Sequence, residues 1–463
     1  MLSDPIAALA TAPGRAALAV IRLSGDGAFG VAAGVIQGFV AAPARTARLA
    51  WFVAADAAPI DRGLYLTFPA PSSYTGEDLV ELTCHGGLLV PAQVLAALHD
   101  AGARPASPGE FTRRAVLNGK MDLVQAEAVG DLIDATAPAQ GQNALRQLEG
   151  GLSRRLATLR ERLIELLALL GYEVDFPEED DGPVGLAQIA GLVDAIRLDL
   201  EALLATAPAG ERLREGALVV FAGRPNVGKS SLFNALLGTE RALVTEVPGT
   251  TRDAIEAHSE MLGWPVRLAD TAGLWEAPER LERLGIEVSR RYLTAADLVL
   301  LCVEAGRPLG EDERAILAEW PVLLVRTKSD LTVGQTVGRT DGQTDVQTVG
   351  RTDGQSDEEV VVSAVTGAGL DALRGAVAER LFGAGQGGYT DLEPMLTRER
   401  HRAALERGRT GLSEARPHLV RGGDAVLAAH HVRRAVVALD ELIGAVDTEE
   451  ILDRIFSRFC VGK

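Results

Sequence analysis

Cysteines, aromatic residues and long apolar runs are all scarce in this chain of 463 residues, and each scarcity disfavours a class of protein. The three cysteines lie far apart, which argues against a disulfide framework and leaves no pair with zinc-ligand spacing. Aromatic residues make up only 4%, whereas alanine, leucine and glycine abound, which favours helices and α/β layers over an all-β fold. No apolar run reaches the roughly 18 residues that a membrane span needs. No signal peptide is recognisable, so the sequence predicts a cytoplasmic protein.

Basic residues are outnumbered, with 46 lysines and arginines against 64 acidic residues and a net charge of −18. A protein that binds nucleic acid through a broad basic face is expected to show the opposite balance. If RNA is bound, a local patch or a partner must therefore hold most of its phosphates. One local candidate is a run of arginines that is more simply interpreted as a solvated helix face: Arg398, Arg400, Arg402, Arg407 and Arg409.

Residues 1–118 combine short strand-like runs with turn signals and one short amphipathic helix, which predicts a compact α+β module. After about residue 120 the pattern changes, because leucines recur at steps of three and four from Leu145 to Leu170. That spacing predicts one long amphipathic helix, interpreted as core packing in a helical bundle, with partner binding as the alternative. A further helix is predicted to about Leu204, followed by a domain boundary at "ATAPAGERLREG".

From "ALVVFAG" to about Leu381, strand-like and helix-like runs alternate, which predicts a parallel sheet. Within this region "TVGRTDGQ" occurs at 336–343 and again at 348–355, and its low apolar content predicts a flexible surface insertion without chemistry. The run "GAGQGG" predicts a second linker, after which the pattern is helical again. The α/β domain therefore interrupts a helical region, and the expected fold class is multidomain α/β.

The run "GRPNVGKSS" follows a predicted strand and opens a predicted helix, which is the context of a phosphate-binding loop. Gly223 and Gly228 allow backbone N–H groups to approach the phosphates of a nucleotide. Lys229 is expected to reach the terminal phosphates, and the hydroxyl of Ser230 is expected to bind magnesium.

Further nucleotide motifs follow in the order expected for a GTP-binding protein. In "VPGTTRD", Thr251 is placed to supply a second hydroxyl to magnesium, and in "DTAG" Asp270 is placed to hold the magnesium shell. The N–H of Gly273 is expected to meet the last phosphate. The residue after it is Leu274, whereas the Ras-type loop has a glutamine there that orients the attacking water. The catalytic group must therefore come from elsewhere, or the activity is lost.

The base is expected to lie against "TKSD" and "SAVTG". Asp330 is placed to accept from the two nitrogens on the guanine edge, and Lys328 is placed to cover the base. Ser363 and Ala364 are expected beneath it. Thr327 stands where asparagine is commonest, so the sequence predicts a weaker link between the base site and the phosphate loop.

These motifs, together with "NGKMDLVQAEA", "ERLERLGIE" and the terminal "FCVGK", resemble the MnmE (TrmE) family of tRNA modification GTPases. The resemblance covers nearly the whole chain except the repeat at 336–355. It implies an N-terminal tetrahydrofolate-binding and dimerisation domain, a discontinuous helical domain and an inserted Ras-like G domain. The implied boundaries are 1–118, 119–212, 216–382 with an insertion at 332–358, and 389–463.

The same resemblance implies an activity and its partners. Members of the family act as homodimers with MnmG, a partner that uses flavin (FAD) and NADH, in a heterotetramer that receives tRNA. Together they add an aminomethyl or carboxymethylaminomethyl group to the wobble uridine of certain tRNAs. The implied cofactors are Mg²⁺, K⁺ and a tetrahydrofolate derivative (5-formyl- or methylene-tetrahydrofolate), with GTP as the hydrolysed substrate.

The resemblance also implies roles for individual residues of the nucleotide site. Asn226, Thr245, Val247 and Thr250 correspond to potassium ligands, and Ser230 and Thr251 to magnesium ligands. Glu282 corresponds to the residue that orients the attacking water, and it acts with Lys229 as the catalytic pair; on its own, Glu282 equally fits a solvent-facing position. The residues implied to contact GTP are Asn226, Val227, Gly228, Lys229, Ser230, Ser231, Thr245, Glu246, Val247, Pro248, Gly249, Thr250, Thr251, Asp270, Thr271, Ala272, Gly273, Thr327, Lys328, Asp330, Ser363 and Ala364.

For folate, the resemblance implies Arg22, Glu81, Lys120 and Lys463. The carboxylate of Glu81 suits the amino edge of the pterin, and the basic groups suit a glutamate tail. Cys460 is implied to act near this site, although a buried structural cysteine is the ordinary interpretation.

Two other functions share some of these motifs. An Era-like regulatory GTPase in ribosome or RNA assembly would carry the same G motifs together with a basic RNA-binding domain. The acidic net charge argues against such a domain, and the sequence shows no KH-type signature. A folate-dependent one-carbon enzyme with a vestigial G domain is disfavoured because Lys229, Ser230, Asp270 and Asp330 are intact.

Overall fold

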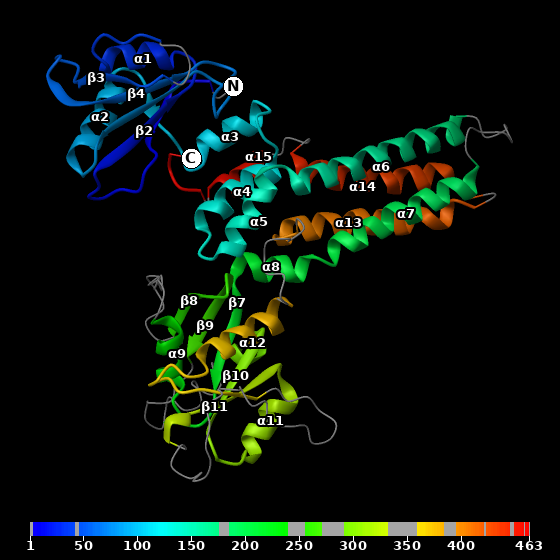
Figure 1. Ribbon diagram of the computed structural model, residues 1–463. Helices are drawn as coiled ribbons and strands as arrows, with labels where there is room; N and C mark the ends of the chain where they lie inside the picture. Colours follow the sequence, from blue (N-terminus) through cyan, green and yellow to red (C-terminus); the bar gives the residue numbers. More distant parts are fainter. Residues whose placement is uncertain are drawn as a thin grey trace, which may run out of the picture. The chain divides into compact units, whose positions relative to one another are not determined.

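The structure is a computed structural model of the chain (Figure 1). It describes residues 3–41, 46–175, 185–238, 255–270, 291–331, 359–383, 395–420, 423–444, 449–457 and 459–462. The chain forms two compact units. Unit 1 comprises Met1–Gly130, Arg146–Leu200 and Ala403–Lys463, and unit 2 comprises Asp131–Leu145 and Glu201–Arg402. The predicted repeat insertion at 332–358 lies outside the described residues, and so does the predicted linker at 383–388 apart from Gly383.

The first part of unit 1 is a six-stranded sheet with the order β3-β4-β5-β2-β1-β6. Its neighbours pair antiparallel, apart from the parallel pair of β1 and β6. The strands are β1 (Ile6–Leu9), β2 (Leu18–Ser24), β3 (Arg48–Val53), β4 (Pro59–Phe68), β5 (Leu79–His85) and β6 (Arg104–Pro105). The helices are α1 (Ala28–Val35), α2 (Leu89–Asp100) and α3 (Glu110–Leu117). The predicted α+β module is confirmed.

The side chains of β2 and β5 alternate between the two faces of the first sheet, one of which is covered by helices. Ile21, Leu23 and Leu82 point to the face that packs on α1 and α2, where they are fully buried. Successive residues of a strand point to opposite faces, so Arg22 and Glu81 lie on the other face. The two residues are directly opposite in the β2–β5 register, which places them side by side.

The remainder of unit 1 is helical, and Figure 1 shows α6, α7, α13 and α14 running beside one another as a long bundle. Of the helices that the structure describes, four have one part in each unit, namely α4 (Leu123–Asp134), α5 (Pro138–Leu148), α7 (Leu186–Leu204) and α13 (Glu399–Ala415). The helical elements within unit 1 are α6 (Gly151–Asp175), η3 (Arg416–His418), α14 (Ala425–Ile443) and α15 (Glu449–Phe456).

The predicted single helix across the leucine repeat is wrong, because the chain forms α5 and α6 there. Gly150 separates them with φ of 82°, a left-handed conformation that ends a helix. Leu145, in α5, is 46% exposed and does not belong to the buried stripe. The predicted bundle core is confirmed for the leucines of α6, which are buried at positions 152, 156, 159, 163, 166 and 170.

Unit 2 contains a second six-stranded sheet with the order β12-β11-β10-β7-β9-β8. The predicted parallel pairing is confirmed, with β8 added antiparallel to β9 at one edge. The strands are β7 (Ala217–Ala222), β8 (Ile255–Met261), β9 (Trp264–Asp270), β10 (Leu298–Glu304), β11 (Val322–Thr327) and β12 (Glu359–Val361). The helical elements are α8 (Ala207–Glu215), α9 (Lys229–Leu237), α11 (Glu311–Glu319), η2 (Ser329–Leu331) and α12 (Leu370–Phe382).

The strands of unit 2 have continuous apolar sequences because helices cover both faces of the sheet. All six residues of β7 are buried, because α9 and α12 pack on one face of the sheet and α11 on the other. The segment "ATAPAGERLREG", where the sequence predicts a boundary, forms α8, and the chain passes from unit 1 to unit 2 just before it, between Leu200 and Glu201. This helix has proline in its first turn and ends at Gly216, where φ is 80°.

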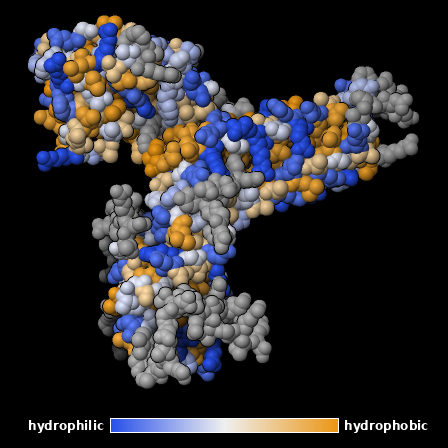
Figure 2. Space-filling model, in the orientation of Figure 1, coloured by the Kyte–Doolittle hydropathy of each residue, from blue (hydrophilic) through white to orange (hydrophobic). Residues whose placement is uncertain are grey.

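The surface view in Figure 2 shows hydrophilic residues mixed with hydrophobic ones along the visible helices of unit 1. At the β3–β4 edge of the first sheet, three large apolar side chains are exposed: Leu49 and Trp51 on the edge strand β3, and Leu64 opposite Leu49 on β4. None of the helices that the structure describes combines the length and the apolar character needed to cross a membrane.

Candidate nucleotide-binding site

The phosphate loop joins the carboxyl end of β7 to the start of α9, at the sheet edge where ligands bind in open parallel sheets. Gly223 is required there, because its φ is +134° and a Cβ would lie 2.3 Å from the carbonyl oxygen of Cys302 on β10. Gly228 precedes α9 in the left-handed conformation and supplies no side-chain cap. The N–H groups of the first turn of α9 therefore remain suited to an anion such as phosphate.

Lys229 lies inside this loop and is 5% exposed. Its Nζ donates to the carbonyl oxygens of Gly223 at 2.9 Å and of Arg224 at 2.8 Å. Burial lowers the pKa of Lys229, while the nearby Cys302 and Asp270 act in the opposite direction. Phosphate oxygens would supply the negative charge that favours the ammonium form.

The carboxyl end of β9 brings Asp270 to the same edge, where it pairs in register with Phe221 of β7. Asp270 is buried, and Ser230 is exposed in the first turn of α9. A carboxylate and a hydroxyl are oxygen donors of the kind that Mg²⁺ prefers. These two residues therefore fit the expected magnesium shell, in which phosphate oxygens and water are the usual remaining ligands. The described residues contain no cluster of three or more histidine, cysteine or acidic side chains that would hold a metal without a nucleotide.

The predicted base-binding residues meet beside the loop. Ser363 is buried, and its Oγ donates to Oδ1 of Asp330 at 2.6 Å, which orients this carboxylate. Lys328 has φ of 56° and forms an ion pair with Glu304 at 3.7 Å, while Ala364 follows Ser363 in the chain. Two loops from separate strands are thus joined at the place where the guanine edge is expected.

Thr327 joins the base-binding segment to the phosphate loop. Its Oγ1 donates to the carbonyl oxygen of Val227 at 2.5 Å. A link between the two is therefore present, and its weakening relative to an asparagine stays a prediction. A threonine hydroxyl is shorter than an asparagine amide, but Thr327 is buried, with 3% exposure, and its position at the end of β11 brings it within reach.

Several expected residues lie outside the described part of the chain. Asn226 is described, exposed and in a left-handed conformation with φ of 62°, and Ser231 is exposed in α9. The expected residues that are not described are Thr245, Glu246, Val247, Pro248, Gly249, Thr250, Thr251, Thr271, Ala272, Gly273, Leu274, Glu282 and Lys463.

In unit 1, Arg22 and Glu81 form an ion pair of 2.8 Å on the open face of the first sheet. The guanidinium lies 5.2 Å from the ring centre of Tyr74 and 5.8 Å from that of Phe111. Lys120 donates to the carbonyl of Pro71, in the loop that also carries Tyr74. The structure thus brings Arg22 and Glu81 into contact, and the loop from Pro71 to Tyr74 lies between them and Lys120.

Cys460 is exposed, and its backbone is held against the N-terminal module. Its carbonyl accepts from the N–H of Gly109 at 3.4 Å, and the buried Gly462 packs on Leu9, whose carbonyl would lie 2.2 Å from a Cβ. The ordinary interpretation of Cys460 as a buried structural cysteine is therefore wrong, while its role near the folate site stays a prediction. Gly109 is two residues before Phe111, whose ring lies beneath Arg22, so the C-terminal segment reaches the same part of the sheet.

Three of the five arginines in the run that begins just before α13 form ion pairs in the structure. Arg398 pairs with Asp131, Arg402 with Glu211 at 3.4 Å, and Arg407 with Glu441. These pairs favour the solvated helix face over an RNA-binding patch.

Sequence reasoning missed two charged residues that the fold uses. Arg114 is 1% exposed and donates to Glu77, Glu110 and Asp4 within the N-terminal module. Asp131 accepts from two arginines in unit 2. The two residues lie on either side of "NGKMDLVQAEA", a run that carries the family resemblance, and neither had been assigned a role.

Comparison with known proteins gives matches over almost the entire chain. The model described as GTP-binding protein TrmE N-terminus matches residues 5–120, and the MnmE helical domain model matches residues 123–460. The chain is 44% identical over 469 residues to the tRNA modification GTPase MnmE of Laribacter hongkongensis, covering 100% of this chain and 99% of the relative. It is 42% identical to that of Ralstonia nicotianae, covering 99% and 96%. It is 41% identical to that of Moorella thermoacetica, covering 100% of both.

Proposed function

The chain belongs to the MnmE family of tRNA modification GTPases, and we propose that it hydrolyses GTP with potassium stimulation to drive modification of the wobble uridine of certain tRNAs. In this proposal it acts with an MnmG-type FAD protein and adds an aminomethyl or carboxymethylaminomethyl group. The observation that carries the proposal is the meeting of the phosphate loop, Asp270 and the Thr327–Asp330 segment at one edge of the sheet in unit 2.

Each described residue of this edge has a chemical task when GTP is bound. Lys229 exchanges the loop carbonyls of Gly223 and Arg224 for phosphate oxygens, which neutralises charge on the terminal phosphates. Asp330, held by Ser363, accepts from the guanine edge and selects guanine over adenine. Ser230 and Asp270 would hold magnesium, which when bound supplies Lewis-acid stabilisation of the phosphate charge.

Potassium is part of the proposal because Leu274 stands where the Ras-type loop has its water-orienting glutamine. A leucine cannot orient water, so another group must do so, and a monovalent cation beside the phosphates would neutralise charge that develops in the transition state. Asn226 is exposed at the loop surface in a left-handed conformation, which suits a ligand of such a cation. We assign the remaining potassium ligands to Thr245, Val247 and Thr250, and water orientation to Glu282.

Steady-state GTP turnover in potassium and in sodium at equal ionic strength tests this part of the proposal. We expect kcat to be at least about tenfold higher in potassium, since removal of one charge-stabilising group typically costs about 10²–10³ in rate. Equal rates in both salts would contradict it.

Glu282→Ala tests the assignment of the water-orienting group. We expect a loss of kcat with little change in KM for GTP, because the carboxylate acts on water in the transition state. Glu279→Ala changes an acidic residue of the same segment and serves as the control. A near-normal rate for Glu282→Ala would return it to a solvent-facing role.

The face around Arg22 carries the folate part of the proposal. Tyr74 and Phe111 provide aromatic rings, Glu81 provides an acceptor for a pterin amino edge, and Arg22 provides a cation. These groups fit a tetrahydrofolate derivative, whose pterin is flat and whose tail is anionic. When bound, the folate would supply the one-carbon unit of the added group. Binding of 5-formyltetrahydrofolate to the full chain and its loss in Glu81→Ala is the corresponding measurement.

The edge of the same sheet supports the proposed homodimer. Leu49, Trp51 and Leu64 are exposed on β3 and β4, and an exposed apolar group on an edge strand is a frequent contact between copies of a chain. Figure 2 shows hydrophobic side chains exposed on this part of unit 1. Sedimentation of the wild-type chain and of the Trp51→Glu variant measures the oligomeric state. We expect a dimer for the wild type and a monomer for the variant.

A further inference from the structure

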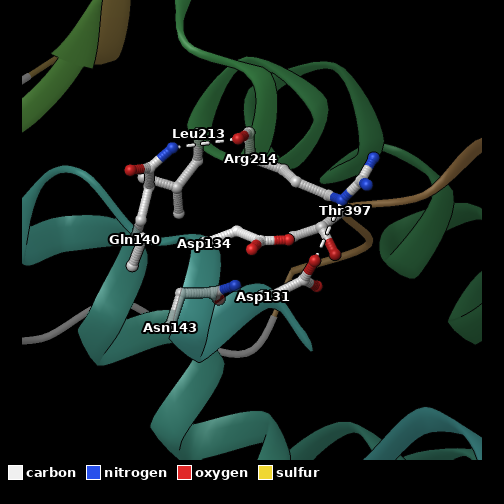
Figure 3. Close-up of a pocket in the computed structure, with 8 residues that line it drawn as sticks. Asp131, Asp134, Gln140, Asn143, Leu213, Arg214 and Thr397 are labelled. Atoms are coloured by element: carbon white, nitrogen blue, oxygen red, sulfur yellow. Dashed lines mark hydrogen bonds and ion pairs between the residues drawn. The ribbon is translucent and has the colours of Figure 1, made fainter. Parts of the chain in front are cut away.

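In unit 2, one carboxylate is paired with both chain segments that flank the second sheet. Oδ1 of Asp131, near the C-terminal end of α4, accepts from Nε of Arg214 at 3.1 Å and from Nη2 of Arg398 at 2.6 Å. Arg214 lies in the last turn of α8, directly before the first strand of that sheet. Arg398 directly precedes α13, after the last helix of the sheet domain. Figure 3 shows Asp131 and Arg214 among the side chains that line a small cavity beside this pair.

The two flanking segments also contact each other. The N–H of Leu396 donates to Oγ1 of Thr206 at 3.1 Å. A Cβ on Gly210 would lie 2.1 Å from the carbonyl oxygen of Leu396, so the two backbones touch at a position where only glycine fits. The segments that enter and leave the sheet domain therefore form one packed junction with Asp131.

The N-terminal part of α5 connects this junction to the strands that lead to the switch segments. Nε2 of Gln140 donates to the carbonyl of Arg214 at 2.9 Å, as Figure 3 shows, and the N–H of Ala139 donates to the carbonyl of Gly263 at 3.0 Å. Gly263 lies in the turn between β8 and β9. The other ends of these two strands continue directly into 239–254 and 271–290, the segments with the expected potassium ligands, Thr251 and Glu282.

The cavity beside Asp131 gives these side chains room to exchange partners. Its volume is about 70 Å³, and its walls include Asp134, Asn143 and Thr397. Asn143 and Thr397 are at least nine-tenths buried, and neither Oδ1 of Asn143 nor Oγ1 of Thr397 has a partner among the described residues. Buried polar atoms without partners are costly, so an exchange of partners that pairs these two atoms would lower this cost.

We propose that Asp131 is a positioning residue that couples the nucleotide state of unit 2 to the tRNA modification reaction, by holding Arg214 and Arg398 together. Its helix α4 and the helix α13 that follows Arg398 both continue along the chain into unit 1, so a shift at this junction is passed on covalently. Asp131 contacts none of the described phosphate-loop or base-binding residues. The inference rests on the proposed function for its modification readout.

Asp131→Asn removes the charge and keeps the shape of the side chain. We expect its potassium-stimulated kcat and KM for GTP to stay within about twofold of wild type, while wobble-uridine modification in a strain lacking the chain falls at least about fivefold, the lower end of usual coupling energies. Asp131→Glu keeps the charge and should restore most of the modification. Wild-type modification by Asp131→Asn would overturn the proposal, and so would an equal loss of GTP turnover and modification.

Asp134→Asn is the matched control, since it makes the same change on the same helix and at the same cavity, but at an exposed side chain outside the two arginine pairs. It should modify uridine as wild type does. Arg398→Gln breaks only one of the two pairs and serves if Asp131→Asn does not fold. It should lower modification in the same direction with GTP turnover retained, and wild-type modification by Arg398→Gln would overturn the proposal.

Amide hydrogen exchange separates this inference from the proposed function. In the wild-type chain, exchange at 131–145, 206–216 and 395–402 should differ between GDP and a non-hydrolysable GTP analogue, and the difference should disappear in Asp131→Asn. If the wild type modifies no uridine but shows this difference, the proposed function fails and the coupling remains. If exchange at these segments is the same in both nucleotide states, the coupling is wrong.

Discussion

The hydroxyl of Thr327 donates a hydrogen bond of 2.5 Å to the carbonyl of Val227, which ties the base-binding segment to the phosphate loop. Thr327→Val keeps the shape but removes the donor and leaves the carbonyl of Val227 buried without it. We expect binding of GDP to weaken roughly fivefold, because one such bond contributes about 1 kcal/mol. Fluorescence titration with a labelled GDP measures this. Thr327→Ser keeps the hydroxyl and should bind as wild type, and unchanged affinity of the valine variant would show that the bond is dispensable.

Asp330 accepts from Ser363 and presents its carboxylate toward the expected guanine edge. Asp330→Asn replaces one of the two acceptor oxygens by an N–H donor, so guanine loses one acceptor while xanthine, which carries a carbonyl at that edge, gains a donor. We expect affinity for GTP to fall at least about tenfold, as for loss of a hydrogen bond to a charged group, and affinity for xanthosine triphosphate to rise. Competition titrations with GTP and with xanthosine triphosphate measure the two affinities. A variant that still prefers GTP would place the base elsewhere.

The close contact between Gly223 and Cys302 predicts a severe effect of a single methyl group. In Gly223→Ala the Cβ would lie 2.3 Å from the Cys302 carbonyl, at a backbone φ of +134°. We expect loss of measurable GTP binding and a lower melting temperature. Gly375→Ala is the control within the same unit, because that helical glycine has only Leu262 at 4.0 Å, and alanine there should stabilise by up to about 1 kcal/mol. Normal GTP binding by Gly223→Ala would contradict the described loop.

Much of this site was predictable from sequence because each part is a local pattern. The phosphate loop needs glycines at fixed positions next to a strand and a helix, and the structure has both at Gly223 and Gly228. The buried strands β7 and β10 were recognisable as apolar runs. Helix ends were less predictable: Gly150 divides α5 from α6, whereas the leucine spacing continues across it.

Contacts between distant segments were not predictable. Asp131 pairs with Arg214 and Arg398, which are 83 and 267 residues away. Nothing in the local sequence of any of the three indicates the other two. The same holds for Thr327, whose hydrogen bond to Val227 depends on its buried position at the end of β11 and is not indicated by its local sequence. Segment "ATAPAGERLREG" has the composition of a linker, but packing against Leu396 makes it helical.

Acid should destabilise unit 1 through the carboxylates around Arg104 and Arg114. The hydrogen bond from Arg104 lowers the pKa of Asp4, and for Glu110 the bonds from Arg104, Ser107 and Arg114 outweigh burial and leave its pKa below 4.5. Carboxylates with a lowered pKa in the fold stabilise it above their ordinary pKa, and this contribution is lost as pH falls through the folded-state value. Thermal unfolding of the full chain between pH 7 and pH 3 should therefore show a steep loss below pH 4.5.

Glu110→Gln tests that explanation. The variant should melt at a lower temperature at pH 7, because Arg114 is 1% exposed and loses a charged partner, and its melting temperature should change less between pH 5 and pH 3. Glu149→Gln alters an exposed carboxylate of the same unit and should follow the wild type. The same steepness in Glu110→Gln and wild type would assign the acid sensitivity to other groups.

The nucleoside composition of tRNA from cells that lack this chain tests the central claim most directly. Mass spectrometry should show the aminomethyl or carboxymethylaminomethyl group missing from wobble uridines, restored by the wild-type chain and not by Lys229→Ala, whose phosphate loop lacks its only lysine. Wobble uridines modified to the same extent with and without the chain would contradict the account.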